Sequence, residues 1–131
     1  MSFERYHRHM LAMSYRKLKV WAKSRELVKV IYQLTQHFPK EELYGLTSQV
    51  RRAAVSIPSN VAEGSQRSSD REFGNYILIA RGSIAELETQ LLLSVDLGYL
   101  TEEAVADALQ NLDEISRMLH ALHSKLTAHR S

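Results

Sequence analysis

A chain of 131 residues, with a formal net charge of +2 and no cysteine, has the size of one domain. The lack of cysteine excludes a disulfide framework, a thiolate nucleophile and a cysteine-based zinc site. No apolar run approaches the roughly 20 residues that a membrane-spanning helix needs. We therefore expect a cytoplasmic protein with no membrane partner.

The first predicted helix spans residues 18–38. Apolar or small side chains recur there at alternating steps of three and four, the pattern of a helix that packs along another helix. These residues are Val20, Ser24, Leu27, Ile31, Leu34 and Phe38. The residue before a proline avoids helical angles, so Pro39 is expected to end this helix. Residues 1–14 lack such a period and are predicted to form a flexible arm before a single domain at 15–128.

The second predicted helix begins at position 40 or 42, ends at position 63 and contains Pro58. A proline inside a helix lacks an N–H group and crowds the carbonyl four residues earlier, which costs about 3 kcal/mol. We predict a bend at Pro58, where Ser56 satisfies the loosened backbone and Asn60 fixes helix register or pairing. Gly64 is predicted to stop the helix.

The third predicted helix spans residues 69–96 and the fourth spans 102–128. Ser69 and Glu72 have the spacing of a capping box, in which each side chain satisfies a free N–H group at the helix start. Glycine inside a helix costs up to about 1 kcal/mol relative to alanine. We therefore expect Gly82 and Ser83 to permit close approach of another backbone, at the bend of the second helix.

Four amphipathic helices joined by short connections predict an all-α fold, an antiparallel up-and-down four-helix bundle. Two of the apolar stripes are too wide for the central seam of one bundle. Surplus apolar surface often marks a subunit interface. The surplus residues are Trp21, Tyr32, Tyr44, Leu92, Leu93, Val95 and Tyr99.

Charge is segregated along the chain. Residues 1–71 hold 13 Lys and Arg against 6 Asp and Glu, whereas residues 72–116 hold 1 against 9. A basic patch indicates a polyanion such as nucleic acid, whereas paired patches of opposite sign equally indicate docking onto another copy. The candidates for phosphate contact are Lys17, Lys19, Lys23, Arg51, Arg52, Arg67 and Arg71.

Three carboxylates are candidates for structural or assembly roles: Glu63, Glu86 and Glu88. We expect planar, bidentate contacts that set helix register or join subunits rather than acid–base chemistry. The arginines considered as their partners are Arg51, Arg52 and Arg81. The Glu-x-x-His motif of di-iron bundles occurs only from Glu4 to His7, in the predicted arm. The sequence therefore predicts no catalytic residue, no metal and no cofactor.

Three spaced motifs resemble the four helix bundle protein family. They are Leu46-Thr-x-Gln-x-Arg-Arg-Ala-x-x-Ser-Ile-Pro-x-Asn-x-Ala-Glu-Gly64, Ala80-x-Gly-Ser-x-x-Glu-Leu-Glu-x-Gln-Leu91 and Leu97-Gly-Tyr-Leu100. That family includes proteins encoded by intervening sequences in bacterial 23S rRNA genes, and it is related to accessory variability proteins of diversity-generating retroelements. The resemblance implies an up-and-down helical bundle that assembles as a homopentameric ring.

Together, the residues and the resemblance predict a non-catalytic homo-oligomeric scaffold. Its basic surface contacts RNA or DNA, and it also holds an unidentified protein partner. The alternative is a purely structural or protein-interaction oligomer with no nucleic-acid role, whose basic and acidic faces meet each other.

Overall fold

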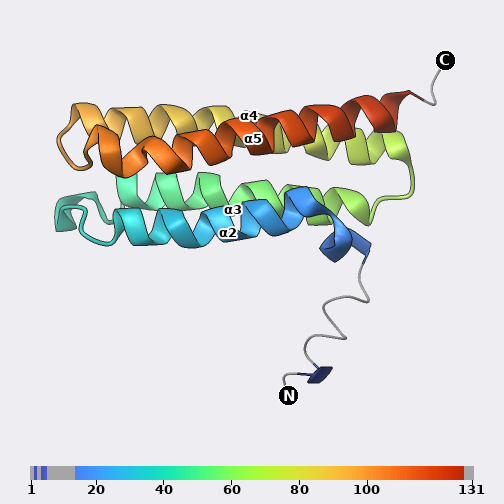
Figure 1. Ribbon diagram of the computed structural model, residues 1–131, viewed down its shortest axis with the longest axis horizontal. Coiled ribbons are helices and arrows are strands. Elements are labelled where there is room, and N and C mark those ends of the chain that lie inside the picture. Colours follow the sequence, from blue (N-terminus) through green and yellow to red (C-terminus); the bar gives the residue numbers. More distant parts are fainter. Residues whose placement is uncertain (1, 3, 6–13, 129–131) are drawn as a thin grey trace.

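The computed structural model describes residues 2, 4–5 and 14–128 of the chain. Four α-helices follow one another: α2 (Lys19–Thr35), α3 (Leu46–Ser65), α4 (Asp70–Asp96) and α5 (Glu102–Thr127). Two short 3-10 helices, η1 (Ser14–Lys17) and η2 (Lys40–Glu42), precede α2 and α3. Figure 1 shows α2 and α3 in one layer and α4 and α5 in a second layer, with successive helices antiparallel. The predicted all-α, up-and-down four-helix bundle is confirmed. The predicted flexible arm and domain boundary stay predictions, because residues 6–13 lie outside the described part.

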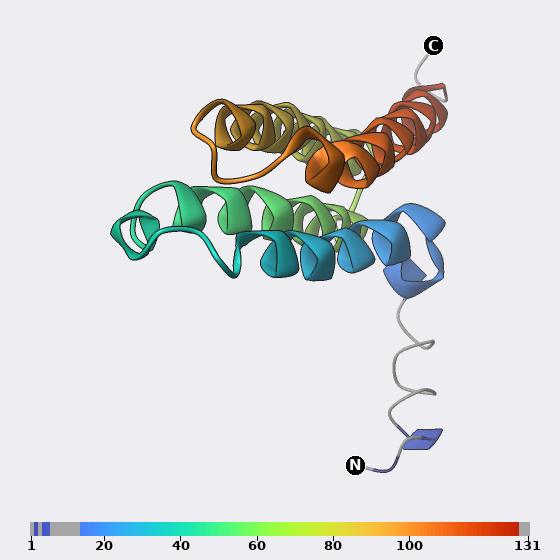
Figure 2. The same ribbon diagram turned by 60° about the vertical axis from the view of Figure 1, so that its left-hand side comes forward.

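The core lies between the two layers. Leu27 and Ile31 on α2 and Ile84, Leu87 and Leu91 on α4 are all buried at steps of three or four. Burying one such side chain contributes about 1.5–3 kcal/mol. Around the bundle, α3 packs against α2 and α4, and α5 packs against α4 and α2 (Figure 2). Helices α2 and α4 therefore lie diagonally across the core.

The connection between α2 and α3 differs from the prediction. Helix α2 ends at Thr35 rather than Phe38, although Phe38 remains buried. Residues 40–42 form the separate helix η2, and α3 begins only at Leu46. The Glu42 carboxylate accepts a hydrogen bond from the Leu46 N–H at 3.2 Å, and so satisfies a free donor at the start of α3.

The same carboxylate joins the two layers. The Tyr99 hydroxyl, in the connection between α4 and α5, donates to Glu42 Oε2 at 2.8 Å. This hydrogen bond, with burial and the nearby carboxylates, raises the pKa of the Tyr99 phenol. The rings of Phe38 and Tyr99 also lie 5.4 Å apart between centroids. Phe38 thus continues the apolar seam beyond the end of its helix.

The starts of α4 and α5 are capped as their sequences suggest. Ser69 Oγ accepts from the Glu72 N–H at 3.2 Å, which confirms one half of the predicted capping box. The Glu72 carboxylate does not reach back to the Ser69 N–H, and accepts instead from the Ser68 hydroxyl at 3.5 Å. Thr101 Oγ1 accepts from the Ala104 N–H at 3.1 Å at the start of α5.

Helix α3 continues through Pro58 without interruption. Two polar side chains bond to carbonyls near the proline: Ser56 Oγ donates to the Ala53 carbonyl at 3.0 Å, and Asn60 Nδ2 donates to the Ser56 carbonyl at 2.7 Å. The carbonyl that loses its helical donor at Pro58 is that of Ala54, four residues earlier. Neither of these two bonds reaches it. The bend at Pro58 stays a prediction.

Two glycines have roles other than the predicted ones. Gly64 does not stop α3, which continues to Ser65; Gly64 is buried, and a Cβ there would lie only 2.6 Å from Tyr76 Cβ. Gly82 is exposed, and a Cβ there would meet no atom within 4 Å. The close approach of α3 to α4 therefore requires glycine at Gly64. The prediction that assigned this role to Gly82 is wrong.

Candidate nucleic-acid and assembly surfaces

The two layers carry opposite charge. Residues 14–65, which include α2 and α3, hold 9 Lys and Arg against 4 Asp and Glu. Residues 70–128, which include α4 and α5, hold 4 against 10. The charge segregation seen along the sequence therefore becomes a segregation between the two faces of the bundle in Figure 1.

Four of the seven predicted phosphate-binding residues belong to elements at one end of the bundle, which we call the basic end. They are Lys17, Lys19, Arg67 and Arg71. The end of η1, the start of α2 and the connection between α3 and α4 lie together there in both views (Figures 1 and 2). Lys17, Lys19 and Arg71 are exposed and have no ion-pair partner among the described residues. These three cations are available to an external anion.

Aromatic packing holds η1 at the basic end. The rings of Tyr15 and Trp21 meet edge to face, with centroids 5.3 Å apart, and the Arg16 guanidinium lies 5.6 Å from the Tyr15 centroid. This cluster positions Lys17 next to the first turn of α2.

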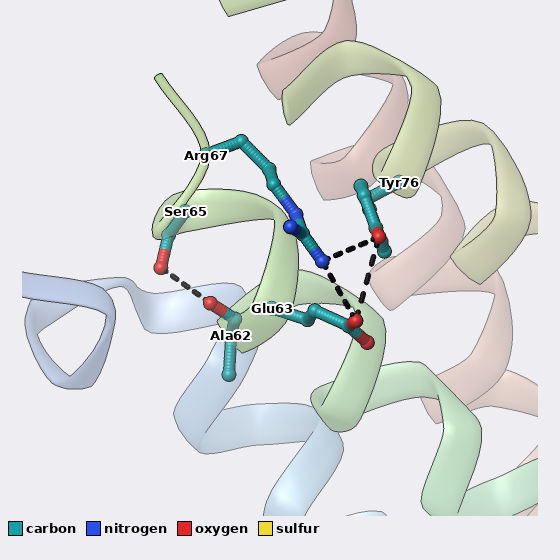
Figure 3. Close-up of polar contacts among 5 residues, drawn as sticks. All are labelled: Ala62, Glu63, Ser65, Arg67 and Tyr76. Carbon is teal, nitrogen blue, oxygen red and sulfur yellow. Dashed lines mark hydrogen bonds and ion pairs between the residues drawn. The ribbon is translucent and has the colours of Figure 1, made fainter. Parts of the chain in front are cut away.

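Arg67 is already engaged within the subunit, as Figure 3 shows. Its Nη2 lies 2.9 Å from Glu63 Oε1 and donates to the Tyr76 hydroxyl at 2.7 Å. Its guanidinium also lies 4.9 Å from the Tyr76 ring centroid. The cluster joins the last turn of α3 to α4, directly beside Gly64.

Two further candidates are tied to helices of the same subunit. Lys23 Nζ on α2 lies 3.0 Å from Glu114 Oε2 on α5. Arg51 Nε donates to Thr35 Oγ1 at 2.9 Å, and its guanidinium stacks 4.5 Å from the Tyr32 ring centroid. Both contacts give these cations a role inside the bundle.

Arg52 differs from these two residues, because it is exposed and has no ion-pair partner in the described part of the chain. It lies on the outer side of α3 and lines the grooves on both sides of that helix.

The predicted pairing of the three glutamates with Arg51, Arg52 and Arg81 is wrong within this subunit. Glu63 pairs with Arg67, and Glu86 accepts from Gln90 Nε2 at 3.3 Å. Glu88 lines a groove between α4 and α5 together with Arg81, without an ion pair between them. A Glu followed four residues later by Arg favours an ion pair on a helix, so the contact with Arg67 could have been found from the sequence.

Ser83 on α4 joins α3 at the level of the proline segment. The single hydroxyl proton of Ser56 has two alternative acceptors, the Ala53 carbonyl and the Ser83 hydroxyl, and Ser83 itself donates to the Ile79 carbonyl at 3.2 Å. Nearby, Gln90 Oε1 is buried without a hydrogen-bond partner. Over the described residues, no three His, Asp or Glu side chains gather into a possible metal site.

The surplus apolar residues form two exposed surfaces. The first, the α4 apolar face, consists of large side chains that are 46–56% exposed: Leu78, Ile79, Leu92, Leu93 and Leu97. The second, the α2–α3 groove, has a volume of about 610 Å³ and is lined by Tyr32, Leu43, Tyr44, Thr47, Ser48, Arg51, Arg52, Val55 and Ser56. Tyr44 is 94% exposed at its edge. Of the seven residues predicted as surplus, Trp21, Val95 and Tyr99 are instead half-buried.

The model of one family, the 23S rRNA-intervening sequence proteins, matches residues 16–121. The chain belongs to this family. The match covers all of α2, α3 and α4 and most of α5, and therefore includes the basic end, the α4 apolar face and the α2–α3 groove.

A crystal structure of a family-related protein has the same fold. That protein, from the S23 ribosomal protein family of Bacteroides thetaiotaomicron, is described as having unknown function. It is 26% identical, with a TM-score of 0.71, over 79% of this chain and 97% of its own. No curated protein matches the chain. None of the helices in the described residues has the length and hydropathy needed to cross a membrane.

Proposed function

We propose that the chain is a non-catalytic, cytoplasmic, homo-oligomeric scaffold that binds RNA or DNA through its basic end and also holds a protein partner. The observation that carries this proposal is the α4 apolar face, where five large side chains are about half exposed on one helix. Exposed apolar patches of this kind mark interaction surfaces in soluble proteins. The number of copies, five in a closed ring, follows from the family resemblance.

The nucleic-acid part of the proposal depends on Lys17, Lys19 and Arg71. These cations belong to η1, the start of α2 and the start of α4, which lie at the same end of the bundle, and they have no ion pair among the described residues. Lys and Arg bind phosphate oxygens without reading sequence, and binding releases counterions, so the affinity falls with salt. In a symmetric ring the basic end is repeated once per copy, and simultaneous contacts then raise the affinity for a long polyanion. The family name, with its reference to 23S rRNA, makes RNA the first probe.

Two double variants with equal loss of charge test this proposal. Lys19→Gln with Arg71→Gln removes cations from the basic end, and Lys29→Gln with Lys40→Gln removes exposed cations elsewhere. Fluorescence anisotropy with a labelled RNA hairpin and a labelled DNA duplex is measured over a salt series. We expect the first variant to lose affinity and to reduce the slope of log K against log salt by about 2, or about 1 per lost phosphate contact. The control variant is expected to keep the parent slope.

A purely structural oligomer is the second candidate function. It is favoured by the engagement of Lys23 with Glu114 and of Arg67 with Glu63, because these cations then serve packing rather than phosphate binding. Light scattering separates the candidates. An oligomer that binds neither probe at low salt supports the structural function, and a single copy at all concentrations contradicts both.

A further inference from the structure

Building on the proposed self-association, we infer which surfaces meet: the α4 apolar face of one copy docks into the α2–α3 groove of the next copy. The occupant of the groove is thus a second copy of this chain. Two kinds of observation carry this inference, the apolar character of both surfaces and their opposite charge.

The α4 apolar face follows one side of its helix. Leu93 and Leu97 come 14 and 18 positions after Ile79, which are close to four and five helical turns. Leu78 and Leu92 form a parallel row beside them, also 14 positions apart. All five side chains remain about half exposed, although α4 packs against both α3 and α5. The exposed rows therefore form a surface that one subunit leaves uncovered.

The α2–α3 groove has matching chemistry. Its apolar side chains include Tyr32, Tyr44 and Val55, and its charged residues are Arg51 and Arg52, with no acidic residue among those that line it. A partner for this groove therefore needs apolar side chains accompanied by negative charge. Nucleic acid offers the charge without the apolar side chains.

The α4 apolar face supplies both features. Glu86 lies midway between Ile79 and Leu93 in the same row, seven positions from each, and Asp96 precedes Leu97. Both carboxylates are exposed. Opposite charges across an interface steer association and fix register. A second copy therefore meets the requirements of the groove with its own α4.

The two surfaces are formed by different elements of one subunit, the first by α4 and the second by α2 and α3. The contact is therefore heterologous, and repeating it gives a ring or a filament. The groove lies beside the first half of α3, and Leu92, Leu93 and Leu97 lie near the end of α4. These two segments share one end of the antiparallel bundle (Figure 1). Neighbouring copies then lie at the same level along the bundle axis. This arrangement favours a closed ring over a filament.

In this arrangement the basic residues have two separate roles, one in the interface between copies and one in phosphate contact. Arg51 and Arg52 become interface residues, covered by the next copy. Lys17, Lys19 and Arg71, at the opposite end from the groove, remain free for phosphate.

Directed cross-linking tests the inference cleanly, because the chain contains no cysteine. Val55→Cys places a thiol in the groove and Leu93→Cys places one on the α4 apolar face. A flexible bismaleimide is added, and products are separated by denaturing electrophoresis. We expect the double variant to give a ladder of covalent oligomers that ends at the ring size, and each single variant to give none. A mixture of the two single variants should give a covalent dimer and nothing larger.

The experiment includes a control thiol pair and an alternative groove variant. Val55→Cys with Ala121→Cys moves the second thiol to an exposed site on α5, and should give no ladder. If Val55→Cys impairs folding, Tyr44→Cys with Leu93→Cys replaces it, because Tyr44 is almost fully exposed. An equally strong ladder from the α5 control would overturn the inference.

The remaining outcomes separate this inference from the proposed function. Dimers from Leu93→Cys alone would show that α4 packs on α4, and would overturn the heterologous contact. A parent protein of several copies by light scattering, with no ladder from either thiol pair, would refute this interface and leave self-association standing. A parent of one copy would refute both.

Discussion

Replacing Gly64 by alanine should destabilise the fold, although alanine favours helix. The added Cβ would lie 2.6 Å from Tyr76 Cβ and 3.0 Å from Phe73 Cδ1. The Tyr76 Cβ is attached directly to the α4 backbone and cannot swing away, so α3 and α4 must move apart locally. Because α3 and α4 pack tightly at this point, the cost is not relieved by a side-chain rotation.

The change in the free energy of unfolding caused by Gly64→Ala is the sum of two opposing effects. Alanine gains up to about 1 kcal/mol over glycine inside a helix, and inserting a carbon atom into a well-packed region costs about 1–3 kcal/mol. We expect the steric cost to dominate because the Tyr76 Cβ is fixed to the α4 backbone, giving a net loss of about 1–2 kcal/mol. Separation of the helices would also weaken the contacts of Arg67 with Glu63 and Tyr76 shown in Figure 3.

Urea unfolding followed by far-UV circular dichroism measures this loss. All variants are compared at one protein concentration, because the proposed self-association would contribute to apparent stability. Gly74→Ala is the matched control. Gly74 is also a buried helical glycine, but a Cβ there would lie 3.6 Å from His123 Cδ2, an ordinary contact. The Gly74→Ala variant should be as stable as the parent protein or more stable by up to about 1 kcal/mol. Equal stabilisation by both substitutions would refute the close approach at Gly64.

Three other predictions concern backbone and side-chain hydrogen bonds. Pro58→Ala should keep the helix content while changing the mass by light scattering or the melting temperature, and a variant equal to the parent in both would contradict a role for the proline. Ser69→Ala should cost about 1 kcal/mol in urea unfolding through loss of the N-cap, whereas Ser68→Ala should cost much less because its one contact, at 3.5 Å, is long. Tyr99→Phe tests pH dependence: the raised pKa of Tyr99 means that its contribution is complete below the unfolded pKa of about 10 and is lost as pH rises through the folded pKa. The stability difference between parent and Tyr99→Phe should therefore shrink above about pH 10, and a pH-independent difference would argue against the bond to Glu42.

Local rules were sufficient to predict most of the bundle. The three–four spacing predicted the buried face of α2, where Val20, Ser24, Leu27 and Ile31 are all buried, because burial in a bundle follows the helical period. The start of α4 was predicted within one residue from Ser69, since capping depends on residues near in sequence. The same spacing misplaced the end of α2, because Phe38 is buried against Tyr99 after the helix has already ended.

The candidate surfaces were harder to predict because they depend on which helices are neighbours. Gly64 was interpreted as a helix stop from its position after Glu63, but its role depends on Tyr76, twelve residues later on α4. Likewise, Lys23 appeared free in the sequence and is paired with Glu114 on α5. Leu78 and Ile79 were not among the residues predicted as surplus, although they are 47% and 53% exposed.

The side chains that form the core differ from those that form the proposed interface. The core seams alone bury large aliphatic residues from all four helices, such as Ile31, Ile57, Leu87 and Leu119, each without exposed surface. The α4 apolar face adds nothing to that core and would favour non-specific association if it stayed exposed. Its interspersed carboxylates, Glu86 and Asp96, restrict which surface it can meet, since a second acidic α4 is repelled and a groove with two arginines is attracted. In the proposed interface, the charge segregation along the chain would serve self-recognition between the two helical hairpins, and the cations at the other end of the bundle would remain free to contact a polyanion.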